Sequence, residues 1–134
     1  MNAVVSHENE LLLNTVQCFL NDEIYPHEDA VDRSGEVPLE LGRQIEARAK
    51  EVGLFAANLP EAVGGGGLNY TSSSIVEREY GKTTHALQSW IARPTELLLA
   101  CEGDQVARYL DPCVTGEKRE LFALTEPEAG SDVM

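Results

Sequence analysis

Apolar residues at helical spacing run through most of this sequence, and their period constrains the fold more than any other feature. They recur every three or four positions within residues 6–32, 38–52 and 70–81. Because a helix completes a turn about every 3.6 residues, such spacing puts the apolar side chains on one face. The sequence therefore predicts a domain assembled from amphipathic helices.

Capping and breaking residues indicate where the first two helices begin and end. Ser6 is suited to cap the first helix, and Pro26, which lacks a backbone donor, should kink that helix or end its first section. The second helix should run over residues 38–52 and stop at Gly53. Residues 32–38, DRSGEVP, have the composition of a turn between the two helices.

The third helix, near residues 70–81, has more than one suitable start. Asn69 or Thr71 could cap it, and Ser74 and Glu77 have the spacing of a capping box. The sequence leaves these alternatives open.

The stretch after the third helix predicts shorter helical pieces. Residues 85–92 and 95–103 are rich in apolar residues and flank Pro94, and the residue before a proline disfavours a helix. Residues 104–114 follow as another short helix. Its inward-facing residues should be Val106, Tyr109 and Leu110.

Near the C-terminal end the pattern changes from helix to strand. LFALT, residues 121–125, is a short apolar run after a polar turn, which favours a β-strand. A lone strand has no partner within this sequence. We therefore expect a mainly α fold, with a helical domain over residues 1–117 and the beginning of a β domain over residues 118–134.

Charge and composition argue against several classes of function. The formal net charge is −13 and there is no run of lysine or arginine, so nucleic acid is not an expected partner. No apolar stretch approaches the roughly 18 residues of a membrane span. The three cysteines have no metal-ligand spacing, and we expect them to be reduced thiols in a cytoplasmic protein.

Other conspicuous residues are better explained by structure than by chemistry. The run from Gly64 to Gly67 fits neither the dinucleotide fingerprint nor the phosphate loop, and predicts a tight turn. Glu23 and His27 alone do not make a metal site. Trp90 stands among apolar residues and is expected in the core. No metal ligand and no catalytic residue is predicted.

The stretch LTEPEAGSD, residues 124–132, resembles the first signature of the FAD-dependent acyl-CoA dehydrogenases. That signature reads hydrophobic, Ser/Thr, Glu, two variable positions, small, Gly, Ser/Thr and Asp, and every position fits. FLNDEIYP, residues 19–26, and two segments at residues 35–54 and 51–82 are similar to the same family. The resemblance covers nearly the whole chain.

This resemblance implies an N-terminal helical domain, a middle β domain that begins at the signature, and a C-terminal helical bundle. By similarity, Phe122, Leu124 and Thr125 would lie along the flavin of FAD, with the Thr125 hydroxyl near the reactive ring nitrogen. Gly130 would let the backbone approach the pyrophosphate. Ser131 would bind FAD and also touch the acyl-CoA substrate.

The implied activity is α,β-desaturation of acyl-CoA thioesters, as in fatty acid metabolism. In the family a glutamate from the last domain removes the proton, and homo-oligomeric enzymes pass electrons to an electron-transfer flavoprotein. No carboxylate here matches that base, so we expect the chain to be the N-terminal part of a longer enzyme and inactive alone. Two alternatives stay open: a non-catalytic helical binding or interaction module, and part of an acyl-CoA oxidase or flavin monooxygenase.

Overall fold

The computed structural model describes residues 6–121, 123 and 125–128 of the 134-residue chain. Helices dominate these residues and none of them lies in a β-strand, which confirms the predicted mainly α fold. The longer helices and one π-helical segment are α1 (His7–Phe19), η1 (Leu20–Ile24), α2 (Tyr25–Ser34), α3 (Leu39–Glu51) and α4 (Tyr70–Tyr80). The shorter ones are η2 (Glu61–Val63), α5 (His85–Gln88), η3 (Glu96–Ala100), η4 (Val106–Leu110) and α6 (Asp111–Thr115).

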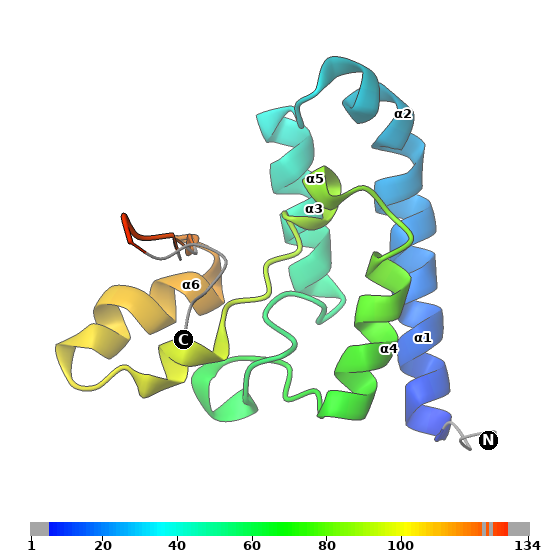
Figure 1. Ribbon diagram of the computed structural model, residues 1–134. Coiled ribbons are helices and arrows are strands. Elements are labelled where there is room, and N and C mark those ends of the chain that lie inside the picture. Colours follow the sequence, from blue (N-terminus) through cyan, green and yellow to red (C-terminus); the bar gives the residue numbers. More distant parts are fainter. Residues whose placement is uncertain (1–5, 122, 124, 129–134) are drawn as a thin grey trace.

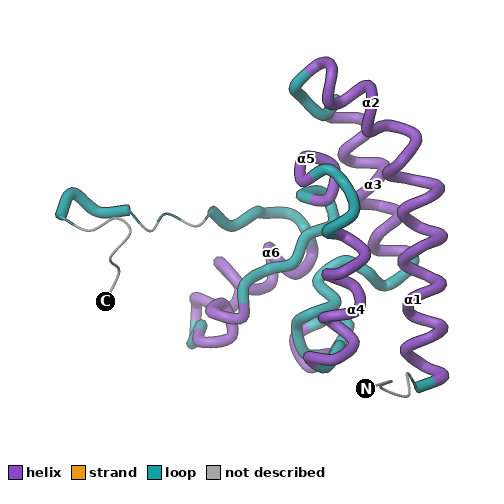
Figure 2. Tube along the Cα trace, turned by 45° about the vertical axis from the view of Figure 1, so that its right-hand side comes forward, coloured by secondary structure: helices purple, strands orange, loops and turns teal. Residues whose placement is uncertain are grey.

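α1, η1 and α2 form one continuous helical rod along one edge of the domain (Figure 1, Figure 2). The Ser6 hydroxyl oxygen accepts a hydrogen bond from the Asn9 amide at 3.3 Å, so the predicted cap is confirmed. Pro26 lies in the first turn of α2, directly after the π-helical η1. Because Pro26 has no N–H to donate to the preceding turn, the helix widens there instead of continuing regularly. Pro26 therefore does not end the helical rod, and its predicted disturbance of the helix takes the form of a π-helical segment.

The hydrophobic core lies where α1 and η1 meet α3 and α4 (Figure 1). Its fully buried side chains include Val16, Leu20, Ile24, Ile45, Leu54, Leu59, Tyr80, Leu87 and Ile91. Burying one aliphatic side chain of this size contributes roughly 1.5–3 kcal/mol. The apolar stripes of the sequence thus become the surfaces that hold the helices together.

The connection between α3 and α4 closes through the glycine run. Gly64 and Gly67 have positive φ angles of 86° and 66°, which favour glycine. The amide groups of Gly64, Gly65, Gly66 and Gly67 donate in turn to the carbonyl oxygens of Glu61, Pro60, Ala56 and Leu59. Because all four donors are used within the loop, this run has no free N–H row for a phosphate. The predicted tight turn is confirmed.

α4 begins at one of the starts that the sequence left open. The Asn69 side-chain oxygen accepts from the Ser72 amide at 3.0 Å, so Asn69 is the cap. The Ser72 hydroxyl donates to the Asn9 side-chain oxygen at 2.8 Å and thereby ties the start of α4 to α1.

The later helical pieces form where predicted but are shorter than expected, and one side chain has another orientation. The two pieces expected on either side of Pro94 are α5 and η3. Leu110 is buried, but Tyr109 is 44% exposed, so its predicted inward orientation is wrong. Residues 106–110 form the π-helical η4, whose turn is wider than that of an α-helix. The α-helical period used for the prediction therefore does not apply there.

The predicted strand at residues 121–125 stays a prediction, as does the domain boundary before residue 118. Phe122 and Leu124 lie outside the described residues. Leu121, Ala123 and Thr125 have no regular secondary structure, and Leu121 is 89% exposed.

Glu79 of α4 is a carboxylate buried to 2% exposure. Lys82 donates to it at 2.5 Å, Gln17 of α1 at 3.2 Å and Arg78 at 3.2 Å. The hydrogen bond from Lys82 is the largest cause that lowers the pKa of Glu79 from its ordinary value of 4.5, while burial opposes it. This cluster forms a second polar tie between α1 and α4.

Replacing Glu79 by glutamine should lower the free energy of unfolding by about 1–3 kcal/mol at neutral pH, because the charge-assisted hydrogen bonds are lost. The folded-state pKa is lowered, so this stabilisation exists above the unfolded value and disappears as the pH falls through the folded value. Urea unfolding of wild type and Glu79→Gln at neutral pH and at about pH 3 measures the difference. Glu8→Gln, on the exposed first turn of α1, is the control. An equal effect of Glu79→Gln at both pH values would contradict the account.

Candidate functional site

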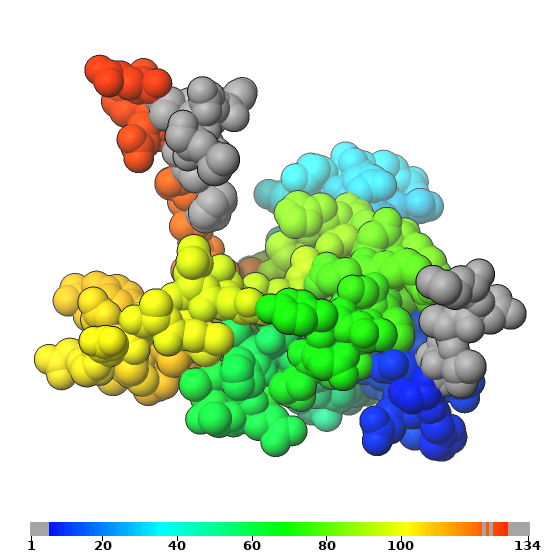
Figure 3. Space-filling model, turned by 60° about the horizontal axis from the view of Figure 1, so that its bottom comes forward, coloured from blue at the N-terminus to red at the C-terminus, as the bar shows by residue number. Residues whose placement is uncertain are grey.

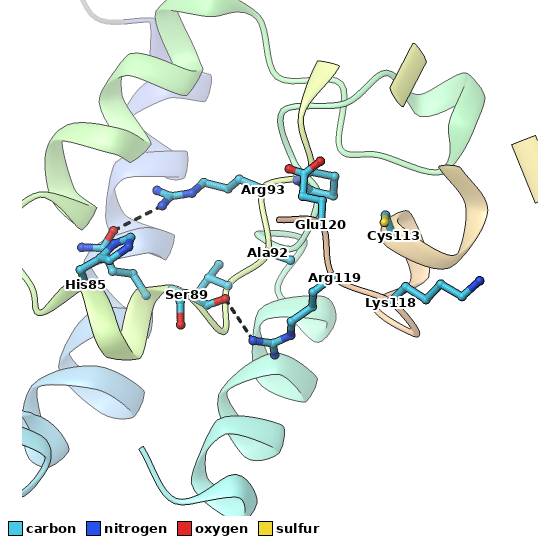
Figure 4. Close-up of a pocket in the computed structure, with 11 residues that line it drawn as sticks. His85, Ser89, Ala92, Arg93, Cys113, Lys118, Arg119 and Glu120 are labelled. Atoms are coloured by element: carbon cyan, nitrogen blue, oxygen red, sulfur yellow. Dashed lines mark hydrogen bonds between the residues drawn. The ribbon is translucent and has the colours of Figure 1, made fainter. Parts of the chain in front are cut away.

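An open pocket of about 350 Å³ lies between the loop after α5 and the stretch that follows α6 (Figure 4). Residues 85–94 form one wall, and Cys113 with residues 118–120 forms the other. Its polar lining includes His85, Gln88, Ser89, Arg93, Arg119 and Glu120. The second wall leads in sequence directly to residues 121–125 and the LTEPEAGSD stretch.

Arg93 holds the first wall by joining the loop to α4. Its guanidinium donates to the Glu77 carboxylate at 2.7 Å. It also donates to the Gln88 side-chain oxygen at 3.3 Å (Figure 4). It also lies 5.1 Å from the centre of the Tyr80 ring. Gln88 donates in turn to the Tyr80 carbonyl at 2.9 Å. These contacts hold the Arg93 guanidinium against α4 and fix the wall.

Arg119 holds the second wall by reaching back to α3. Its guanidinium lies 3.9 Å from the Trp90 ring centre and donates to the Glu46 carboxylate at 3.1 Å. It also donates to the Ser89 carbonyl at 3.5 Å (Figure 4). Trp90 rests against Gly42 of α3, where a Cβ atom would overlap the indole ring. The expectation that Trp90 lies in the core is therefore only partly right: Trp90 is half-buried and supports a cation.

Lys118 and Glu120, the neighbours of Arg119, form hydrogen bonds with other elements. The Lys118 amide donates to the Pro112 carbonyl at 2.9 Å, and its ammonium donates to the Arg108 carbonyl at 3.0 Å. A Glu120 carboxylate oxygen accepts from the Thr95 amide at 2.6 Å, at the start of η3. Three consecutive residues are thus fastened to three different parts of the domain.

A second hollow, of about 510 Å³, adjoins the pocket and is lined in part by Leu97, Tyr109 and Leu121. These side chains are 70%, 44% and 89% exposed. Large apolar side chains gathered around one hollow mark an interaction surface. Cys113 borders both hollows, and burial raises the pKa of its thiol. A neutral thiol of this kind is not an activated nucleophile.

The described ranges contain no group of three or more His, Cys, Asp or Glu side chains that could hold a metal ion. Glu23 pairs with Arg48 of α3 at 3.1 Å. Cys18, Cys101 and Cys113 are free thiols. No helix within the described residues has both the length and the apolar character needed to cross a bilayer.

Only one of the five residues predicted to contact FAD falls within the described structure. Thr125 is exposed. Phe122, Leu124, Gly130 and Ser131 lie outside the described residues, so the cofactor contacts stay predictions. The pairing between Arg119 and Trp90 was not predicted, because no local sequence pattern links two residues so far apart.

Comparison with known proteins decides the family. The family model of the acyl-CoA dehydrogenase N-terminal domain matches residues 6–117. The chain belongs to this family. The resemblance found in the signature and the upstream segments is thereby confirmed, and the helical fold is that of the family's N-terminal domain.

Several curated relatives cover almost all of the chain. Subunit CarC of the caffeyl-CoA reductase-Etf complex from Acetobacterium woodii is 32% identical over 95% of this chain and 34% of its own length. A 3-(aryl)acrylate reductase from Clostridium sporogenes is 30% identical over 95% of this chain and 34% of its own length. The mitochondrial long-chain specific acyl-CoA dehydrogenase of Sus scrofa is 30% identical over 97% of this chain and 30% of its own length.

The chain therefore spans about a third of the length of these relatives. No solved structure matches the chain significantly.

Gly42→Ala should destabilise the domain by about 1–3 kcal/mol, because the new methyl group must push the Trp90 ring off α3. An alanine is otherwise favoured over glycine within a helix, so the overlap with Trp90 is the reason that we expect the free energy of unfolding to fall rather than rise. Trp90 is the single tryptophan, and its fluorescence should move to the red on exposure. Gly81→Ala is the matched control, since a Cβ there meets only ordinary contacts. Unchanged fluorescence and stability in Gly42→Ala would refute the packing described.

Proposed function

We propose that this chain supplies the N-terminal domain of an FAD-dependent acyl-CoA dehydrogenase, which desaturates acyl-CoA thioesters between the α and β carbons. The family match over residues 6–117 carries the proposal. A second support is the position of the open pocket, whose wall at residues 118–120 leads into the LTEPEAGSD stretch. The boundary before residue 118 would then separate the helical domain from the beginning of a β domain.

The described part of the signature region is compatible with a bound flavin. An isoalloxazine ring presents hydrogen-bond donors and acceptors along its edge, which extended backbone can match. The backbone groups of Leu121, Ala123 and Thr125 form no hydrogen bond with another described residue, and all three residues are exposed. We propose that the exposed backbone of this stretch meets the edge of the cofactor.

We assign the contacts as the family resemblance implies. Phe122, Leu124 and Thr125 would lie along the flavin ring, with the Thr125 hydroxyl near the reactive ring nitrogen. Gly130 would give the pyrophosphate close access to the backbone, and Ser131 would contact both FAD and the acyl-CoA. Bound FAD supplies the hydride acceptor. The residues of this chain bind and orient the reactants, and the proton-abstracting base comes from sequence beyond the matched third of the enzyme.

Partners and location follow from the same proposal. The substrate is an acyl-CoA thioester, and the complete enzyme is a homo-oligomer that passes electrons to an electron-transfer flavoprotein. One relative is named as a subunit of an Etf complex, which supports this acceptor. The free thiols are in keeping with a cytoplasmic location. Because relatives named as reductases occur beside dehydrogenases, the direction of the reaction has to be measured.

Two other functions make different predictions. A non-catalytic helical binding or interaction module would bind acyl-CoA or a protein but would not take up FAD. An acyl-CoA oxidase or flavin monooxygenase would bind FAD, but its reduced flavin would react rapidly with molecular oxygen. Anaerobic reduction by acyl-CoA followed by admission of oxygen therefore distinguishes all three.

The protein expressed from its complete open reading frame should purify with flavin absorbance that bleaches on addition of acyl-CoA. Thr125→Ala should weaken FAD binding about fivefold to tenfold, the effect of one lost hydrogen bond. Equilibrium titration with FAD measures the affinity. Thr71→Ala, an exposed threonine on α4, is the control. A wild-type protein that binds no FAD would rule out the proposed function.

A further inference from the structure

The chain leaves the helical domain at residues 118–120. Beyond this point the described residues extend away from the body of the domain (Figure 2), and they stand clear of it in the space-filling view (Figure 3). Leu121 is already 89% exposed. The direction in which the chain continues is therefore set by what holds residues 118–120.

Arg119 provides the tie that reaches farthest across the domain. Lys118 and Glu120 bond to η4, α6 and η3, which lie in the same C-terminal part of the domain. Arg119 instead joins this part to α3 through Glu46, a residue 73 positions away in sequence. It thus fixes the exit point relative to the helical core rather than to its immediate neighbours.

The surface on which the Arg119 side chain rests is formed by Gly42 and Glu46 of α3 together with Trp90. Gly42 and Glu46 are one turn apart, so they share a face of the helix. The bare surface at Gly42 admits the Trp90 ring, and the ring supports the flat guanidinium. Glu46 has a side chain only 16% exposed, and its second oxygen accepts from Lys50 at 2.6 Å. The carboxylate is therefore held in place before Arg119 reaches it.

Arginine makes these contacts better than lysine could. A guanidinium can stack on an aromatic face and donate in two directions at once, here to Glu46 and to the Ser89 carbonyl. A lysine ammonium is a point charge that retains the attraction to the carboxylate but loses the stacking and the fork.

We propose that Arg119 is a positioning residue, which by lying across Trp90 and donating to Glu46 fixes the point at which the chain leaves the helical domain after residue 120. This inference rests on the proposed function, because it assigns Arg119 an effect on FAD through the flavin-contacting residues that follow it. Arg119 itself need not touch the cofactor. It limits the conformations of the next residues before FAD binds and so lowers the entropy lost on binding.

The first experiment tests the contacts of Arg119 with Trp90 and Glu46 in the absence of FAD. Arg119→Ala should red-shift the emission of Trp90 and raise the hydrogen-exchange rate of residues 118–121 at least tenfold, whereas Arg119→Lys should give intermediate values. Glu46→Gln, which keeps the shape of the side chain but removes its charge, should reproduce part of the effect. Arg33→Ala is the control, because Arg33 is exposed and paired only within α2. Unchanged emission and exchange in Arg119→Ala would overturn the inference.

The second experiment tests the consequence for FAD in the protein expressed from its complete open reading frame. Arg119→Ala should weaken FAD binding about tenfold and alter the visible flavin spectrum, with partial rescue by Arg119→Lys and no effect of Arg33→Ala. Circular dichroism checks that each variant is folded, and Glu46→Gln offers a milder test if Arg119→Ala unfolds. If a variant with red-shifted Trp90 emission bound FAD with the affinity of the wild type, only the positioning role would be overturned. Absence of FAD from the wild type would instead overturn the proposed function and with it the flavin part of this inference. The contacts of Arg119 with Trp90 and Glu46 would then be judged by the first experiment alone.

Discussion

Trp90 lies against α3 because Gly42 leaves the helix surface bare at that point, and the candidate site depends on this contact. The indole ring supports Arg119, and Arg119 holds one wall of the pocket. α3 can serve as the base because Ile45 and Ala49 are completely buried against the other helices. The hydrophobic core thus fixes α3, and α3 in turn fixes the stretch that leads to the signature.

The sequence predicted those parts of the fold that depend on local pattern. Val16, Ile24 and Ile45 are buried as their helical spacing indicates. Pro26 follows a π-helical segment and Gly53 follows the end of α3, because their backbone chemistry acts within a turn. Tyr109 was missed because a π-helical segment changes the period on which the prediction depends.

The candidate site was harder to predict because its contacts join distant residues. Arg119 meets Glu46 across 73 positions, and Gln17 meets Glu79 across 62. Neither pair has a local pattern, so only the packed structure reveals it. The signature motif is the opposite case: its residues are recognisable in sequence by family resemblance, while most of them lie outside the described residues.

The chain belongs to this family and spans about a third of its relatives' length. Leu97, Tyr109 and Leu121 are exposed beside the pocket, and burial raises the pKa of the Cys113 thiol between the hollows. This arrangement agrees better with a role in binding FAD and acyl-CoA than with catalysis by the chain alone. The proposal therefore places orientation of FAD and acyl-CoA here and proton abstraction elsewhere in the enzyme.

The most direct test of this account is a crystal structure of the protein from its complete open reading frame with FAD and a non-reacting acyl-CoA analogue. The account predicts that the flavin lies along residues 122–125, that Arg119 stays stacked on Trp90, and that the pocket beside it faces the bound ligands. A flavin bound on another surface of the protein, with residues 122–125 packed away from it, would contradict the account.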